Sequence, residues 1–286
     1  MNTITSKDGT EIAYERTGTG PPLVLVHGSG VSDHRRWDIG GVGDALSEHL
    51  TVYALDRRGR GQSGDGDSYS LDREVDDVVA VIESIDRTTD EQADGVNDEQ
   101  ADGVYDEPIT LLGHSLGANI ALEAALRTDA LDRLILYEPG IAVGDHEFSN
   151  EPIVAEMNDL LAEGKNEAAL VVFMREIAGL PEEDIETFQS DPTWQDRVAG
   201  AHTIPREEQV IAAYEWRPSR FEEMTTPTLL LTGEMSPEIY RDAIRAVHEA
   251  LPTSTVVTFE NQQHVAMNTD PDRFVAEVLD FVRSTP

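Results

Sequence analysis

The chain contains no cysteine, which excludes disulfide bonds and metal centres built from thiolates. Long apolar runs are also absent, since none approaches the roughly 18 residues that a membrane-spanning helix needs. The polar segment 1–18 lacks the apolar stretch of a secretory signal. These absences predict a cytoplasmic protein that is not bound to a membrane.

Positive charge is scarce. The chain has 56 Asp and Glu residues against 21 Lys and Arg, a formal net charge of -35, and its lysines are Lys7 and Lys165. Phosphate groups would be repelled, so neither nucleic acid nor an anionic membrane is an expected partner. Self-repulsion of this size opposes a compact fold unless salt screens it. The composition resembles that of cytosolic proteins from halophiles that accumulate salt, which is our hypothesis for its origin.

Motifs for bound metals and nucleotides are missing or incomplete. There is no phosphate-binding P-loop, no H-E-x-x-H and no His/Cys metal spacing. The segment 59–64 matches G-x-G-x-x-G, but no helix begins directly after it, and a dinucleotide site requires that helix N-terminus. We therefore expect no cofactor and no metal. Five nearby arginines are expected to form surface or loop ion pairs, with attraction of an anionic substrate as the lesser alternative: Arg35, Arg36, Arg57, Arg58 and Arg60.

Short apolar segments alternate with helical patterns along most of the chain. This alternation predicts an α/β fold with a mostly parallel sheet covered by helices on both faces. The expected strands are 10–16, 22–26, 51–55, 109–112, 133–137, 228–232 and 255–259, and the expected helices are 71–85, 116–127, 238–251 and 271–282.

Two regions interrupt the alternation. Residues 89–104 are a tandem acidic octapeptide, which predicts a disordered surface loop over 87–107. Residues 144–222 show helical periods with almost no strand pattern, which predicts a helical cap inserted into a core formed by 1–143 and 223–286. Five large side chains of this cap either pack its own interior or line an apolar substrate pocket: Trp194, Trp216, Tyr214, Phe173 and Met174.

The segment 109–117 carries the strongest functional signal. An apolar strand ends in Gly113-His-Ser115-Leu-Gly117, and a helical pattern follows at once. Strand, tight turn and helix are the context that the nucleophile elbow of G-x-S-x-G requires, because the turn exposes the serine in a strained conformation. Ser115 is therefore the predicted nucleophile.

A serine nucleophile needs a general base, and in this fold the base comes last in the chain. His264 follows the last predicted strand by a short loop, which places it at the carboxyl end of that strand. His146 and His202 fall in the predicted cap, and His248 falls in a helix. We therefore predict His264 as the base.

The acid that orients the base is harder to place. In this fold the acid usually lies in the loop after the strand 228–232. That loop contains Glu234, which directly follows a glycine and lies too early in the loop to point at the histidine. Glu138 ends the otherwise apolar strand 133–137, where a carboxylate without a partner would be costly. We favour Glu138 and keep Glu234 as the alternative.

The oxyanion hole requires two convergent backbone N–H groups. Leu116, directly after the nucleophile, is expected to supply one, and Ser29, in the small-residue loop after the strand 22–26, the other. His27 is expected to bond that loop's backbone.

Taken together, four motifs resemble those of the α/β-hydrolase superfamily: His27-Gly28, Asp56–Ser63, Gly113–Gly117 and Gln263-His264. The resemblance implies an eight-stranded sheet with a cap inserted after the sixth strand, and a structural role for the turn 56–63. Some members carry the acid after the sixth strand, which supports Glu138. A serine in place of an aspartate argues against haloalkane dehalogenase or epoxide hydrolase chemistry.

The residues and the resemblance together predict a serine hydrolase that cleaves a small carboxylic ester, thioester or lactone through an acyl-enzyme on Ser115. The expected partner is a small apolar ester-like substrate, and a homo-oligomer is an open possibility. Two alternatives remain, a cofactor-free perhydrolase or haloperoxidase with the same residues, and a catalytically silent ligand-binding protein.

Overall fold

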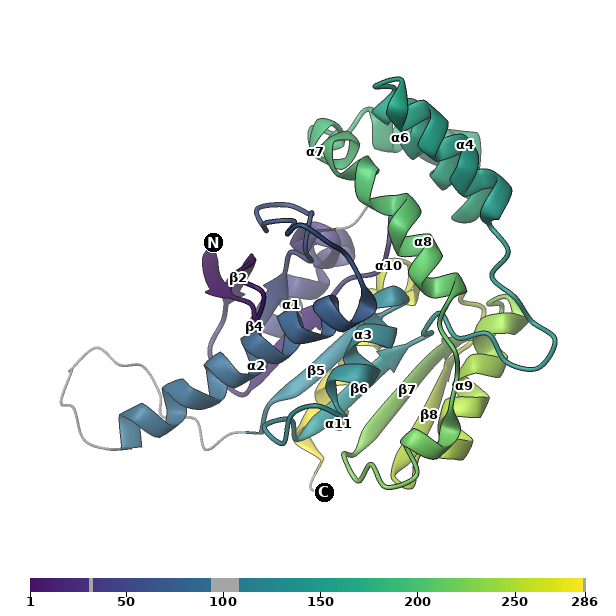
Figure 1. Ribbon diagram of the computed structural model, residues 1–286. Coiled ribbons are helices and arrows are strands. Elements are labelled where there is room, and N and C mark those ends of the chain that lie inside the picture. Colours follow the sequence, from purple (N-terminus) through teal and green to yellow (C-terminus); the bar gives the residue numbers. More distant parts are fainter. Residues whose placement is uncertain (31–32, 94–107, 285–286) are drawn as a thin grey trace.

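The computed structural model describes residues 1–30, 33–93 and 108–284. One eight-stranded sheet organises these residues, in the order β1-β2-β4-β3-β5-β6-β7-β8 (Figure 1). All neighbours run parallel except β1 with β2 and β2 with β4. The strands are β1 (Asn2–Thr5), β2 (Glu11–Thr17), β3 (Pro22–Val26), β4 (Thr51–Leu55), β5 (Thr110–His114), β6 (Arg133–Tyr137), β7 (Thr228–Gly233) and β8 (Ser254–Phe259).

The central strands of the sheet are buried on both faces because their sequences are largely apolar. Successive side chains of a strand point to opposite faces, so Val24 and Val26 join one core while Leu23 and Leu25 join the other. Helices α2 (Leu71–Ala93), α3 (Leu116–Ala124) and α9 (Glu238–Ala250) cover the first face. Helices α1 (Val42–Ser47), α10 (Ala266–Thr269) and α11 (Pro271–Arg283) cover the second.

The predicted fold class is confirmed, with two corrections to its elements. β1 was not expected, because Asn2–Thr5 is polar and largely exposed and carries no alternation. The predicted loop 87–107 begins too early, since α2 continues to Ala93 on a polar helical sequence that contains neither glycine nor proline. The rest of that loop, and most of the repeat, lies outside the described residues.

Between β6 and β7 the chain forms the inserted helices α4 (Glu151–Ala162), α5 (Asn166–Val172), α6 (Glu182–Gln189), α7 (Trp194–Ala199) and α8 (Ile204–Ala212), with short 3-10 and π turns at Phe173–Ile177, Gly200–Thr203 and Pro218–Arg220. They have a core of their own, which contains Phe173, Met174 and Trp194. Tyr214 and Trp216 instead pack against the sheet's first core. Figure 1 shows α8 nearest the sheet and α4 and α6 farther out. The domain boundaries at 143 and 223 stay a prediction.

Three of the arginines expected to form surface or loop ion pairs do so from the loop after β4. Arg57, Arg58 and Arg60 each pair with a carboxylate, and all three are buried. Burial is tolerated because α2 and α8 bring a glutamate or aspartate to each guanidinium.

Among the residues that the structure describes, no helix is both long and apolar enough to cross a bilayer.

Candidate active site

Ser115 occupies the sharp turn between β5 and α3. Its backbone has φ 56° and ψ −124°, a conformation that L-residues rarely adopt. The two flanking glycines permit the turn: a Cβ on Gly117 would lie 2.2 Å from the carbonyl oxygen of Val26, and one on Gly113 would lie 2.2 Å from that of Gly117. The strained serine at the end of a strand is what the G-x-S-x-G pattern predicts.

Glu138 and His264 are in direct contact. His264 Nδ1 lies 2.6 Å from Glu138 Oε2, while Glu138 Oε1 accepts hydrogen bonds from Thr232 Oγ1 at 2.7 Å and from the Gly233 N–H at 2.8 Å. Glu138 is fully buried, and burial alone would raise its pKa. The hydrogen bond and charge of His264 outweigh burial, so the pKa of Glu138 is lowered and the carboxylate stays ionised.

The loop that carries His264 is fixed by β5 and β6. Tyr137 Oη donates to the carbonyl oxygen of Gln263 and accepts from the Ala266 N–H at 2.9 Å. His114, the residue before Ser115, donates from Nε2 to the carbonyl oxygen of His264 at 2.9 Å, and the two imidazole centroids are 4.7 Å apart. His264 therefore lies beside the strand end that presents Ser115. Burial and the charge of His264 hold the pKa of His114 well below its usual range, so His114 is neutral.

Near Ser115, the described residues include two backbone N–H groups without a hydrogen-bond acceptor. Leu116 is the first residue of α3, and Ser29 follows Gly28, where a Cβ would lie 3.0 Å from Ser115 Cβ. Within the described ranges, neither the Leu116 N–H nor the Ser29 N–H meets an acceptor. These are the donors that the sequence predicts for an oxyanion hole. His27 bonds the same loop, with Nδ1 2.8 Å from the carbonyl oxygen of Gly28.

The remaining candidates lie elsewhere. Glu234 is exposed and accepts from the Asn261 N–H at 3.0 Å, rather than contacting a histidine. His146 contacts Asp242, His202 contacts the carbonyl oxygen of Ala199, and His248 contacts Ser254. The structure thus brings Glu138 to His264.

Three residues near the site were missed from the sequence: Asn150, Glu208 and Tyr240. The ring of Tyr240 stacks on that of His264 with centroids 4.2 Å apart. Glu208, on α8, accepts from Ser29 Oγ and from Asn150 Nδ2, each at 3.1 Å. Helical spacing from Ile204 could have placed Glu207 and Glu208 on the buried face of α8, but acidic residues are too common in this chain to stand out.

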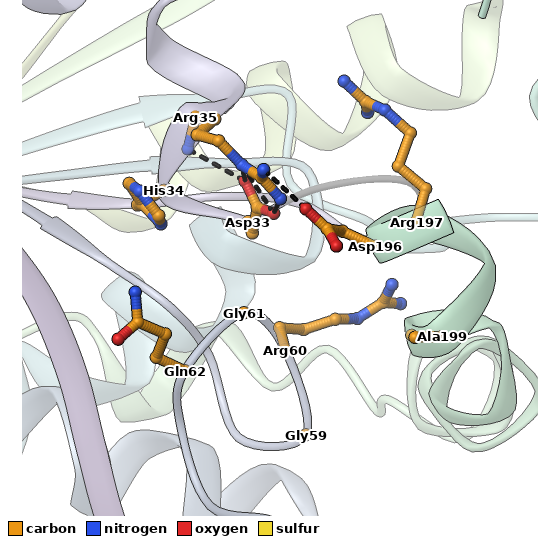
Figure 2. Close-up of a pocket in the computed structure, with 11 residues that line it drawn as sticks. Asp33, His34, Arg35, Gly59, Arg60, Gly61, Gln62, Asp196, Arg197 and Ala199 are labelled. Atoms are coloured by element: carbon orange, nitrogen blue, oxygen red, sulfur yellow. Dashed lines mark hydrogen bonds and ion pairs between the residues drawn. The ribbon is translucent and has the colours of Figure 1, made fainter. Parts of the chain in front are cut away.

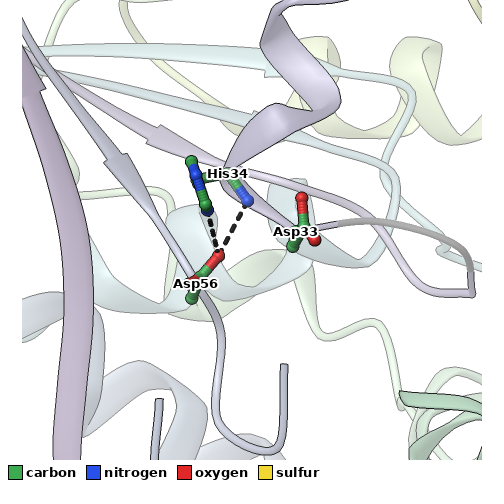
Figure 3. Close-up of side chains that lie close together, drawn as sticks. All are labelled: Asp33, His34 and Asp56. Carbon is green, nitrogen blue, oxygen red and sulfur yellow. Dashed lines mark hydrogen bonds and ion pairs between the residues drawn. The ribbon is translucent and has the colours of Figure 1, made fainter. Parts of the chain in front are cut away.

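Asp33, His34 and Asp56 form a compact group in which one side-chain nitrogen or oxygen atom from each lies within 4.8 Å of the others (Figure 3). Each already has partners in the chain. Asp56 Oδ1 accepts from the His34 N–H at 2.9 Å and lies 2.7 Å from His34 Nδ1, Asp56 Oδ2 accepts from the Gln62 N–H, and Asp33 pairs with Arg35. The group braces the turn 56–63, which fits the structural role implied for that turn.

A cavity of about 540 Å³ lies between the loop at Asp33, the turn at Gly59 and helix α7 (Figure 2). Three arginines line it, of which Arg35 pairs with Asp33 and Asp196, and Arg60 pairs with Glu207. The third, Arg197, donates from Nε to Thr193 Oγ1 at 3.3 Å. Neither Ser115 nor His264 lines it. These contacts favour the ion-pair interpretation of Arg35 and Arg60 over attraction of an anionic substrate.

Comparison with known proteins agrees with this architecture. The model of the Alpha/beta hydrolase family matches residues 23–277. An alpha/beta hydrolase from Sphaerobacter thermophilus DSM 20745 is 32% identical, covers 98% of this chain and 99% of its own, and superposes with a TM-score of 0.77. The esterase RhEst1 from Rhodococcus sp. ECU1013 is 24% identical, with coverages of 100% and 99% and a TM-score of 0.74. The (E)-2-((N-methylformamido)methylene)succinate hydrolase of Acinetobacter baylyi is 24% identical over 96% of this chain and 94% of its own.

Proposed function

Because the chain belongs to the Alpha/beta hydrolase family, we propose that it hydrolyses small carboxylic esters, thioesters or lactones through an acyl-enzyme on Ser115. The observation that carries the proposal is the 2.6 Å contact between His264 Nδ1 and the buried Glu138, beside a strained serine on the neighbouring strand. A carboxylate on Nδ1 leaves Nε2 as the nitrogen that exchanges a proton with the nucleophile.

In the proposed reaction, His264 Nε2 removes the proton of Ser115 Oγ as that oxygen attacks the carbonyl carbon. The Leu116 and Ser29 N–H groups stabilise the resulting oxyanion. His264 then passes the proton to the departing alcohol or thiol, which leaves Ser115 acylated. Water, deprotonated by His264, attacks the acyl group, and the proton returns to Ser115 Oγ as the carboxylic acid departs.

Glu138 is a positioning residue in this scheme. It fixes the orientation of the imidazole and stabilises the positive charge that His264 gains in each transition state. The scheme uses no cofactor or metal. The names of two similar proteins, an esterase and an (E)-2-((N-methylformamido)methylene)succinate hydrolase, support hydrolysis as the reaction class. The alternative of a silent binding protein rests on the lack of an acid at the usual place after β7, and the contact of Glu138 with His264 supports an acid after β6 in its stead.

A chain-length series of p-nitrophenyl esters, measured in molar KCl, tests the proposal. We expect turnover of short acyl chains that Ser115→Ala and His264→Ala each reduce by roughly 10⁴-fold or more. Turnover that survives in Ser115→Ala would contradict the acyl-enzyme scheme. A soluble, folded wild type without activity on any ester of the series would contradict ester hydrolysis itself.

A further inference from the structure

Glu208 is a buried carboxylate held only by neutral groups. It lies on α8, is 5% exposed, and accepts from Ser29 Oγ and Asn150 Nδ2 at 3.1 Å each. Two neutral hydrogen bonds compensate poorly for removing a negative charge from water. Burial therefore raises the pKa of Glu208 to about 7, although both hydrogen bonds lower it.

The other buried carboxylates differ from Glu208 in their partners. Within the described residues, each of the other six buried acids has an arginine or histidine partner: Asp56 with His34, Glu74 with Arg57, Asp77 with Arg58, Glu123 with Arg220, Glu138 with His264 and Glu207 with Arg60. Glu208 has no basic side chain within ion-pair distance among those residues. The nearest acidic neighbour in the chain, Glu207, further raises the pKa of Glu208.

Glu208 also contacts the loop that carries one of the predicted oxyanion donors. Its hydrogen-bond donor Ser29 belongs to the loop that approaches Ser115 at Gly28. The ring of Tyr240 stacks on His264, and the negative charge of Glu208 adds to burial in raising the pKa of Tyr240. The carboxylate thus contacts the loop of Gly28 and Ser29, here called the oxyanion loop, and its charge acts on the tyrosine that stacks on the predicted base.

We infer that Glu208 determines substrate specificity, and that the site prefers small esters carrying a protonated amine near the scissile carbonyl. The inference rests on the proposed ester hydrolysis. The ammonium group would supply the cation that the chain itself does not, and would donate a hydrogen bond to the carboxylate. At low salt the strongly negative net charge acts in the same direction, because it concentrates cationic substrates and repels anionic ones, whereas molar salt screens this long-range effect and leaves the contact with Glu208.

Two pairs of esters of matched shape test the inference. In the first pair the amine is on the alcohol part: 2-(dimethylamino)ethyl butyrate against 3-methylbutyl butyrate. In the second it is on the acyl part: ethyl 4-(dimethylamino)butyrate against ethyl 5-methylhexanoate. Hydrolysis is followed by proton release at neutral pH and fixed KCl, and the readout is the ratio of kcat/KM for the ammonium ester to kcat/KM for its neutral partner.

We expect the wild-type ratio to be about tenfold or more in at least one pair, and Glu208→Gln to bring that ratio close to one. Glu156→Gln, the same change at an exposed position of α4, is the matched control and should keep the wild-type ratio. The wild-type ratio is informative even if the Glu208 variant does not fold.

Ratios near or below one in both wild-type pairs would overturn the inference, as would a ratio that Glu208→Gln leaves unchanged. If the neutral esters are hydrolysed in a Ser115-dependent way without charge preference, only the specificity assignment fails. If no ester is hydrolysed, the proposed function fails as well.

Discussion

Individual side chains carry the proposed chemistry, and Glu138 is the clearest example. Its carboxylate contacts His264, whereas Glu234 faces the Asn261 backbone. We expect Glu138→Gln to reduce kcat by roughly 10²–10⁴-fold, because the imidazole loses its orienting charge. Glu234→Gln should stay within about threefold of the wild type. Steady-state turnover of one ester decides between them, and an active Glu138→Gln with an inactive Glu234→Gln would reverse the assignment.

Glu208 should show the stability cost of a buried unpaired acid. Its pKa is about 7 in the folded chain against an ordinary 4.5, so folding favours the protonated form. Ionisation therefore destabilises the fold as pH rises from about 4.5 through 7, by up to about 3 kcal/mol.

The matching measurement is the free energy of unfolding by denaturant at pH 5 and pH 8, at constant salt. Glu208→Gln should be close to the wild type at pH 5 and more stable than it at pH 8. A difference between the two proteins that does not depend on pH would contradict the buried, unpaired carboxylate.

These site residues differ in how far the sequence predicts them. Ser115 stands in a motif with a required local context, and the position of His264 after the last strand follows from chain order. The contact of Glu138 could be anticipated because an acid at the end of an apolar strand needs a partner. Glu208 could not, because its role depends on which face of α8 meets the oxyanion loop, and packing between distant segments decides that.

Among the helices, α8 connects the inserted helices to the turn after β4 through an ion pair between Glu207 and Arg60. This fully buried carboxylate accepts from Arg60 Nη2 at 2.8 Å and from the Gly30 N–H at 3.1 Å. Burial alone would raise the pKa of Glu207, but the charges of Arg60 and Arg57 lower it to about 2. The pair should therefore stabilise the fold above about pH 4.5, and the stabilisation should be lost as pH falls through about 2.

A double-mutant cycle measures how much the interaction between Glu207 and Arg60 contributes to the free energy of unfolding. Glu207→Gln should lower the free energy of unfolding by about 3–5 kcal/mol at pH 7, because Arg60 keeps a buried, uncompensated charge. Adding Arg60→Met should recover part of that loss. Additive losses in the double variant would show that the two side chains do not depend on each other.

The strands, and the helices that pack on the sheet, were predictable where the local sequence pattern of apolar and polar residues determines the element. β3, β5 and β6 are buried along their whole length on both faces, as parallel strands must be, and their sequences are largely apolar. β1 is polar and is a strand because it pairs with β2, and such tertiary pairing leaves no local signal. The helical continuation of α2 into the acidic repeat was missed because its composition resembles that of disordered segments.

The chain as a whole carries a formal net charge of -35, and this sets the conditions in which it should fold. We propose adaptation to high salt as the reason for that charge. At molar ionic strength the Debye length falls to about 3 Å, which leaves little long-range repulsion between surface acids. The melting temperature should therefore rise steeply between about 0.1 M and 2 M KCl. Equal melting temperatures at the two concentrations would contradict salt-dependent folding.

Fluorophosphonate labelling followed by peptide mass spectrometry tests the central claim, the activated Ser115, without knowledge of the substrate. The account predicts one adduct on the wild-type protein, located on Ser115, absent from Ser115→Ala and formed far more slowly in His264→Ala. A folded wild type that stays unlabelled, or an adduct that persists in Ser115→Ala, would contradict it.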